Sequence, residues 1–327
     1  MPRWIARTLK GVGWCLLGLL VIGCAVWGYW GYSPVPDEPA LSGVAQSELL
    51  EWEGLERRFV EYIPANLPAG APLLLVLHGS VMNGGVMRIA AGYEFDRLAD
   101  EKGFAVVYPT GYLGHWNDCR NKAQFAAKRE QIDDSGFLLA LIDRMVQRYQ
   151  LDPARVFLVG YSNGGHMAFR LGIEAPDRIA AIAVAAASVP EPQDSSCDYD
   201  GPTPRVMLVN GTEDNWNPYE GGDTSGFGVH SRGNVISAVA SAEHFARRNG
   251  AVASAQVEQL PRVNRKDRTR VTLRQWLRDD APYVALYSIE GGGHVFPQPV
   301  YRFPRMYGLT SDDLNLPQAA VAFFGLQ

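Results

Sequence analysis

One serine stands in a setting that could make it a nucleophile. Ser162 lies between Gly160 and Gly164 in a Gly-x-Ser-x-Gly pattern, after the apolar run 155–159 and before a helix-like stretch. A sharp strand-to-helix turn leaves no room for side chains two positions before and after the serine, and glycine fills both positions. Such a turn exposes the hydroxyl and leaves backbone N–H groups free to stabilise developing negative charge. The pattern predicts nucleophilic catalysis, although a non-catalytic strand–helix connection can share it.

A serine hydroxyl needs a histidine base, and the histidine in turn needs a carboxylate that orients it. On a fold with this kind of turn, the chain order is nucleophile, acid, histidine. Asp214 and His294 follow Ser162 in that order, and each comes after an apolar run and among glycines. The sequence therefore predicts Ser162, Asp214 and His294 as a triad. Glu213 and Asp223 are alternatives for the acid.

Two backbone N–H groups are expected to form the oxyanion hole. One belongs to Asn163, which follows the nucleophile, and the other to Ser80, in the loop after the apolar run 73–77. His78, at the end of that run, is expected to brace the loop by hydrogen bonding. His166 lies one turn into the helix after Ser162, and we expect it to point away from the serine and to serve in packing.

Aromatic residues in the loops are candidate walls of a substrate site. Two long loops, 110–130 and 215–232, mix aromatic and polar residues without periodicity, and loops after strand ends are where α/β folds place ligand contacts. The candidate substrate-binding residues are Trp116, Trp216, Tyr219 and Phe296. Each could instead support the fold.

The elements that must position these residues alternate between strand and helix. Runs of consecutive apolar residues are typical of strands buried on both faces, and therefore of a parallel sheet. The alternation predicts an α/β class protein with a doubly wound, mostly parallel sheet and one catalytic domain over residues 51–327. The expected strands include 73–77, 104–108, 155–159, 179–187, 205–209, 257–259, 271–277 and 283–289, and the expected helices are 86–102, 137–149, 167–172, 235–248 and 317–325.

The N-terminus carries an apolar segment. Residues 11–32 contain no charged side chain and, as a helix, would span about 33 Å, enough to cross a bilayer. Three basic residues precede it, which predicts a signal anchor over 1–32 with the bulk of the chain outside the cytoplasm. A Pro-rich linker is expected over 33–50. A cleaved signal peptide and a lipoprotein signal with a lipidated Cys24 are alternatives.

Charge and cysteine content narrow the possible partners. The formal net charge is -5, and without Arg3, Arg7 and Lys10 the remainder carries -8 (-5 minus 3), which argues against a nucleic-acid partner. Cys119 and Cys197 are the only cysteines outside the apolar segment, and an exported protein would allow a disulfide between them. No Cys/His spacing resembles a zinc site, so neither a metal nor another cofactor is expected. No feature predicts an oligomeric state.

Four motifs together resemble a known family. In chain order they are LLLVLHGSVMNGG, LDPARVFLVGYSNGGHM, GTEDNWNPYEGG and GGGHVFP. They are similar to the poly(3-hydroxybutyrate) depolymerase and feruloyl esterase family of α/β-hydrolases, and the similarity runs roughly from residue 55 to residue 300. The resemblance implies the α/β-hydrolase fold and the same triad. Family members usually have cysteine where Ser80 stands, and Trp-Pro-Gly where this chain has Val295-Phe296-Pro297.

These observations predict an exported serine esterase that forms an acyl-enzyme intermediate. Its expected substrate is a small-molecule or polymeric carboxylic ester of the feruloyl, acetyl or hydroxyalkanoate type. We expect it to be membrane-anchored and to face the periplasm or cell exterior, or to be secreted. A peptidase or dienelactone-type hydrolase on the same fold is one alternative, because fold alone does not fix the reaction. A catalytically inactive, membrane-tethered binding protein is another.

Overall fold

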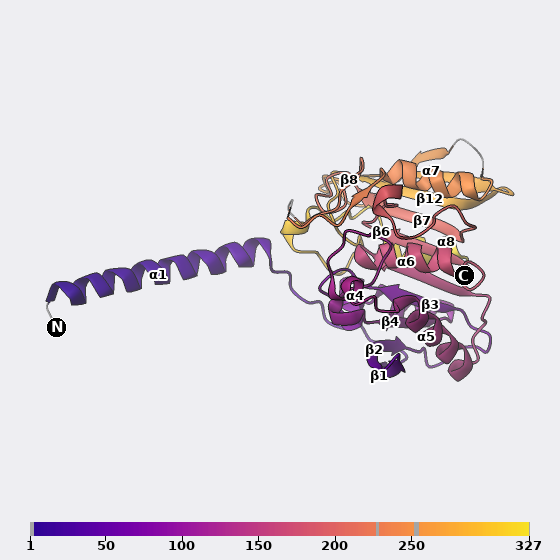
Figure 1. Ribbon diagram of the computed structural model, residues 1–327, viewed down its shortest axis with the longest axis horizontal. Helices are drawn as coiled ribbons and strands as arrows, with labels where there is room; N and C mark the ends of the chain where they lie inside the picture. The colour runs from indigo at the N-terminus through magenta and orange to yellow at the C-terminus, as the bar shows by residue number, and fades with distance from the viewer. Residues whose placement is uncertain (1–2, 227–228, 252–254, 327) are drawn as a thin grey trace.

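A single ten-stranded sheet runs through the part of the chain that the computed structural model describes, residues 3–226, 229–251 and 255–326 (Figure 1). The strand order is β1-β2-β4-β3-β5-β6-β7-β12-β11-β10. The six strands from β4 to β12 are parallel, and antiparallel strands flank them on both sides. The strands are β1 (Ala45–Trp52), β2 (Leu55–Tyr62), β3 (Leu73–Leu77), β4 (Ala105–Pro109), β5 (Val156–Tyr161), β6 (Ala181–Ala185), β7 (Arg205–Gly211), β10 (Gln256–Gln259), β11 (Arg270–Arg278) and β12 (Ala281–Glu290), while β8 (Gly222–Asp223) and β9 (Asn234–Val235) form a separate pair.

Helices cover both faces of this sheet. One face packs against α5, α6 and α7, and the other packs against α2, α3 and α8. The predicted doubly wound α/β architecture is therefore confirmed. The helices of the body are α2 (Gly84–Ala90), α3 (Glu94–Lys102), α4 (Ala126–Arg129), α5 (Asp134–Tyr149), α6 (Asn163–Glu174), α7 (Ala238–Arg248) and α8 (Leu316–Phe324), with short 3₁₀ turns η1 (Tyr112–Gly114), η2 (Pro192–Asp194) and η3 (Arg305–Tyr307).

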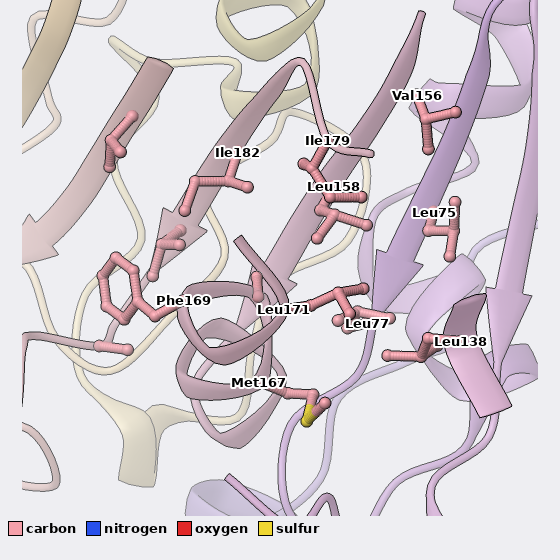
Figure 2. Close-up of a cluster of buried hydrophobic side chains, with 14 of the residues drawn as sticks. Leu75, Leu77, Leu138, Val156, Leu158, Met167, Phe169, Leu171, Ile179 and Ile182 are labelled. Atoms are coloured by element: carbon pink, nitrogen blue, oxygen red, sulfur yellow. The ribbon is translucent and has the colours of Figure 1, made fainter. Parts of the chain in front are cut away.

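The apolar strands are buried on both sides because successive side chains point to opposite faces. In β3, Leu75 and Leu77 join the core beneath α6, whereas Leu74 and Val76 join the core beneath α2 and α3. Figure 2 shows the first of these cores, in which side chains of α6 such as Met167 lie over the strands. This packing fixes α6, and with it the turn that precedes it, against the sheet.

Two elements differ from the predicted pattern. The helix expected over 86–102 is two helices, because Gly92 and Tyr93 take positive φ angles of 68° and 58° and break it. The segment 33–50, expected to be a linker, contains the start of β1 at Ala45. Before β1 the chain lies against the body, where the Ser42 N–H donates to Asp100 at 2.7 Å and Glu38 pairs with Arg88.

The N-terminal helix α1 (Arg3–Trp30) extends away from the body as a separate arm (Figure 1). The sequence predicts that it crosses a membrane. Within the described residues, however, no helix combines the length and the apolar character that a bilayer crossing needs, so the predicted membrane anchor is not supported.

Candidate active site

Ser162 lies in a tight turn between β5 and α6. Its backbone has φ 54° and ψ -118°, a sparsely populated region for a residue with a side chain. Backbone segments approach one another closely at Gly160 and at Gly164, the two glycines that flank Ser162. A Cβ on Gly160 would lie 2.3 Å from the Gly164 carbonyl oxygen, and a Cβ on Gly164 would lie 2.4 Å from the Leu77 carbonyl oxygen. Glycine is therefore required at both positions.

His294 and Asp214 meet Ser162 at the carboxyl ends of their strands. Asp214 follows β7, and His294 follows β12 after three glycines. The Nδ1 atom of His294 lies 2.7 Å from Oδ2 of Asp214, and its Nε2 atom lies 2.9 Å from Oγ of Ser162. Because a carboxylate only accepts hydrogen bonds, Nδ1 donates the proton and Nε2 is free to accept one from the serine. Glu213 and Asp223, the alternative acids, are both exposed.

Backbone groups hold the acid and the base in place. The Oδ1 atom of Asp214 accepts the N–H groups of Trp216 at 2.7 Å and Asn217 at 2.9 Å, so only the second oxygen faces the histidine. The His294 N–H donates to the Tyr307 carbonyl at 2.7 Å, and the Tyr161 hydroxyl donates to the His294 carbonyl at 2.8 Å. Both side chains are buried, with 4% of Asp214 and 5% of His294 exposed, so little water competes for these bonds.

Asn163 occupies the first turn of α6, where backbone N–H groups have no acceptor within the helix. Its side chain is tied to the loop that follows β4. Oδ1 accepts the Trp116 N–H at 2.8 Å, and Nδ2 donates to the Trp116 carbonyl at 3.1 Å and to Asp118 at 2.7 Å. Burial alone would raise the pKa of Asp118, but the neighbouring Arg120 guanidinium lowers it to about 2. No motif in the sequence marks this Asp118–Arg120 pair.

The loop of the second predicted oxyanion donor is braced by His78. The ring accepts the Gly111 N–H at Nε2, 2.9 Å away, and Nδ1 donates to the Gly79 carbonyl at 2.7 Å. Burial lowers the pKa of His78 to about 4, so the ring is neutral and can accept and donate in this way. Ser80 itself lines the cavity that Ser162 faces, and its Oγ has no hydrogen-bond partner among the described residues.

The cavity beside Ser162 has a volume of about 420 Å³ and is largely apolar. Met82, Val86 and Ile89, from the loop after β3 and from α2, form one side of it. Four aromatic residues form another part of the lining, and they are Trp216 from the loop after β7 and Tyr301, Phe303 and Tyr307 from the C-terminal part of the chain. We call these four residues the aromatic wall. Trp216 stacks over His294 with a ring-centroid distance of 5.9 Å, so the aromatic wall reaches the catalytic histidine candidate.

Three of the four predicted aromatic contacts do not line this cavity. Trp116 is fully buried, and its indole N–H donates to the His78 carbonyl at 3.0 Å, so it packs inside the protein. Tyr219 is buried and shares a 2.6 Å hydrogen bond with Ser288. Phe296 is fully buried beside Phe95. The structure therefore places these three side chains in the interior, because the residue type of an aromatic does not separate a site wall from a core.

Several cavity residues were missed. Tyr301, Phe303 and Tyr307 lie in a stretch after the histidine that has no clear periodicity, and the one available signal was the density of aromatic residues there. Val35 reaches the cavity from the segment after α1, and Arg232 reaches it from the loop before β9. Neither position carries a motif.

Two further predictions concern structure around the site. His166 is buried against Phe169, in keeping with a packing role, and burial holds its pKa well below the usual range. Cys119 and Cys197 form the predicted disulfide. This bond joins the loop that carries Asp118 to the loop after β6.

Comparisons with known proteins agree with an ester hydrolase. Residues 59–198 match the family model described as Esterase PHB depolymerase. A protein from Nocardia uniformis described as "Putative esterase NocK" is 29% identical over 79% of this chain and 75% of its own length. The poly(3-hydroxybutyrate) depolymerase of Ralstonia pickettii is 31% identical over 53% of this chain, but only 37% of that relative is covered.

A solved structure supports the fold assignment. The acetyl xylan esterase from Aspergillus awamori superposes with a TM-score of 0.56 at 16% identity, covering 83% of this chain and 94% of that chain. The family match and the relatives together identify the reaction class. The chain carries an Esterase PHB depolymerase domain over residues 59–198, and it is a carboxylic ester hydrolase.

Proposed function

We propose that the chain is an exported serine esterase in which Ser162 is the nucleophile, His294 the general base and Asp214 the residue that orients the base. The observation that carries this proposal is the pair of hydrogen bonds on one imidazole ring, to Ser162 at 2.9 Å and to Asp214 at 2.7 Å. The first bond is short enough for direct proton transfer from Ser162 to His294, and the second is short enough for Asp214 to orient the ring.

The arrangement accounts for each step of ester hydrolysis. His294 takes the proton of Ser162 as the oxygen attacks the ester carbonyl carbon, and the N–H groups of Asn163 and Ser80 stabilise the oxyanion. The protonated imidazole then donates this proton to the leaving alcohol, which departs and leaves an acyl-enzyme. Water attacks the acyl group by the same sequence and releases the carboxylic acid.

The cavity supports an ester with an apolar acyl or alcohol group. Its wall of Trp216, Tyr301, Phe303 and Tyr307 offers ring faces and edges for an aromatic acyl group, and Met82 and Ile89 offer an aliphatic surface. Feruloyl, acetyl and hydroxyalkanoate esters are the candidate substrates, since relatives of this chain are described as feruloyl esterase, acetylxylan esterase and poly(3-hydroxybutyrate) depolymerase.

The disulfide supports export. A bond between Cys119 and Cys197 persists in the oxidising environment outside the cytoplasm, whereas cytoplasmic thiols are kept reduced.

Labelling of the purified full-length chain with a fluorophosphonate probe, followed by peptide mapping, tests this proposal. We expect the label on Ser162 and its loss in Ser162→Ala and His294→Ala. Turnover of an ester should fall by about 10⁶-fold in both variants, as in other serine triads. Ser47→Ala, on the exposed strand β1, is the control and should keep both label and activity.

Two outcomes would contradict the proposal. If a well-folded chain takes no label and cleaves no ester, it is a binding protein with the fold of a hydrolase. If matched amides are cleaved as fast as the corresponding esters, the chain is a peptidase or amidase.

A further inference from the structure

The cavity beside Ser162 contains one permanent charge. Among the described residues that line it, Arg232 is the only lysine or arginine, and no aspartate or glutamate is present. The remaining lining residues are almost all aliphatic or aromatic. A cation in such surroundings is costly unless an anion accompanies it, because apolar walls solvate charge poorly.

Among the described residues, the carboxylate whose charge acts on Arg232 is that of Asp118, which is already paired with Arg120. The guanidinium of Arg232 is half-buried and forms no ion pair or side-chain hydrogen bond with a described residue. Its recorded neighbour is the ring of Phe125, whose centroid lies 5.2 Å from the guanidinium carbon. Burial lowers the pKa of Arg232, the nearby Arg120 lowers it further, and Asp118 raises it by less, so the net effect opposes the charge that the residue carries.

The other buried arginines of the described chain are treated differently. Arg57 pairs with Asp134 at 2.5 Å, and Arg120 pairs with Asp118 at 2.5 Å. Arg88 likewise pairs with a buried aspartate. Each of these three arginines thus has a carboxylate partner, and the half-buried Arg205 donates to the carbonyl oxygens of Pro282 and Phe323. Among the described residues, Arg232 has neither kind of partner.

The backbone at Arg232 is well fixed. Its N–H donates to the Thr224 carbonyl at 2.9 Å, and Asn234, two residues further on, is also anchored, since its N–H donates to Asp194 at 2.7 Å. Arg232 thus lines the cavity from a braced segment of the chain between β7 and β9, which also carries Trp216.

From this arrangement we infer that the preferred substrate is an ester that carries a free carboxylate, and that Arg232 binds this carboxylate while Ser162 attacks the ester carbonyl. A planar guanidinium binds a carboxylate through two parallel hydrogen bonds, a geometry that a lysine does not reproduce. Suitable substrates are monoesters of dicarboxylic acids and oligoesters that end in a carboxylate. The inference deepens the proposed esterase function and rests on it.

Matched esters test the inference. On the acyl side, the pair is mono-4-nitrophenyl adipate and 4-nitrophenyl hexanoate, and on the alcohol side it is 4-acetoxybenzoate and 4-acetoxybenzamide. For each pair the measured quantity is the ratio of kcat/KM for the carboxylate ester to kcat/KM for the neutral ester. We expect the wild-type ratio to favour the carboxylate in at least one pair, which also assigns the carboxylate to the acyl or the alcohol side.

Variants distinguish direct carboxylate binding by Arg232 from a change in the overall charge of the protein. In Arg232→Met the ratio should fall by about 10-fold or more, the range for a hydrogen bond to a charged group. Arg232→Lys should recover only part of the ratio. Arg247→Met removes the same charge from the exposed surface of α7 and should leave the ratio unchanged. As an independent measure, adipate should slow fluorophosphonate labelling of the wild-type chain more strongly than that of Arg232→Met.

The outcomes are distinct. Ester hydrolysis with no carboxylate preference in either pair, or a ratio that is the same in Arg232→Met and wild type, would overturn the inference while leaving the esterase function intact. Hydrolysis of none of the four esters by a folded chain would overturn the proposed esterase function, and this inference with it.

Discussion

The two oxygens of Asp214 have different tasks. Oδ1 accepts two backbone N–H groups, from Trp216 and Asn217, and Oδ2 faces His294. The backbone groups therefore fix the rotation of the carboxylate, and the carboxylate fixes the tautomer of the imidazole, with its proton on Nδ1. The orientation of His294 thus depends on the loop that contains Trp216 and Asn217, and the hydrogen bonds to Asp214 hold that loop in place.

Asp214→Asn separates these tasks. An amide cannot accept from both backbone N–H groups and also accept from His294 without turning one NH₂ hydrogen towards a donor. We expect kcat to fall by about 10⁴-fold, the effect of the same change in a well-studied serine protease, where the histidine adopts the wrong tautomer. Esterase kinetics measure it, and Glu213→Gln, which alters the exposed neighbouring carboxylate, is the matched control. Equal losses in the two variants would remove Asp214 from the triad.

The hydrogen bonds of the Asn163 side chain hold the backbone N–H of this residue in place. Its side-chain amide is held by Trp116 and Asp118, and Asp118 is in turn held by Arg120. Because three polar groups hold the side chain, the adjacent N–H has little freedom, which is what preorganised stabilisation of an oxyanion requires. The buried Asp118–Arg120 ion pair thus helps to hold the neutral side chain of Asn163 in place.

At the scale of elements, the approach of α6 to the strands decides whether Ser162 reaches its partners. Gly164 lies in the first turn of this helix, and a Cβ there would meet the carbonyl oxygens of both Leu77 and His78, at 2.4 and 2.5 Å. Those atoms belong to the backbone of β3 and of the loop that carries Ser80. The steric overlap with these atoms could be relieved only if α6 moved away from the sheet.

Gly164→Ala and Gly172→Ala therefore make a matched pair on one helix. Gly164→Ala should destabilise the chain by at least about 1–3 kcal/mol through overpacking and should abolish fluorophosphonate labelling. In Gly172→Ala the new methyl group would lie 3.3 Å or more from the side chains around it, and the helix gains up to about 1 kcal/mol of intrinsic propensity. Urea unfolding and labelling measure both effects. Similar losses in both variants would mean that α6 tolerates no methyl group anywhere, and not that the turn is special.

The elements also show what a sequence can and cannot predict here. The runs 73–77 and 205–209 lie in strands as expected, because the buried apolar residues 73–77 and 206–209 follow one another without a break, which fits a parallel sheet and little else. The break between α2 and α3 was missed because Gly92 lies within a helical pattern of apolar residues. The aromatic wall was mostly missed because Tyr301 and Tyr307 are placed by contacts with distant parts of the chain. Local pattern predicts elements and motif-bearing residues, whereas the cavity depends on how loops pack.

On the scale of the whole molecule, the cavity joins segments from both ends of the chain. Val35 comes from the segment after α1, and Tyr301 and Phe303 come from the segment before η3. The two segments contact each other, since the Ser33 hydroxyl donates to the Arg302 carbonyl and Arg305 lies over the ring of Tyr29, 4.4 Å from its centroid. Changes near the N-terminus can therefore alter the shape of a site whose catalytic candidates lie far along the sequence.

Acid stability is a further property of the whole molecule. His78 is fully buried, and burial lowers its pKa from 6.5 to about 4. Between these values the unfolded chain binds a proton that the folded chain excludes. The free energy of unfolding therefore has its full His78 contribution above pH 6.5 and loses it as the pH falls towards 4. The buried His166, whose pKa is lowered well below 6.5, acts in the same direction.

His78→Gln should flatten this dependence. Glutamine does not titrate, yet its side chain can accept the Gly111 N–H and donate to the Gly79 carbonyl as the imidazole does. Urea unfolding between pH 7 and pH 4.5 should give a slope that is smaller than that of the wild type by up to one proton, about 1.4 kcal/mol per pH unit. The comparison of slopes is independent of any constant loss of stability in the variant. A variant slope equal to that of the wild type would mean that His78 takes up its proton without unfolding, and that the brace on the Ser80 loop tolerates a charged ring.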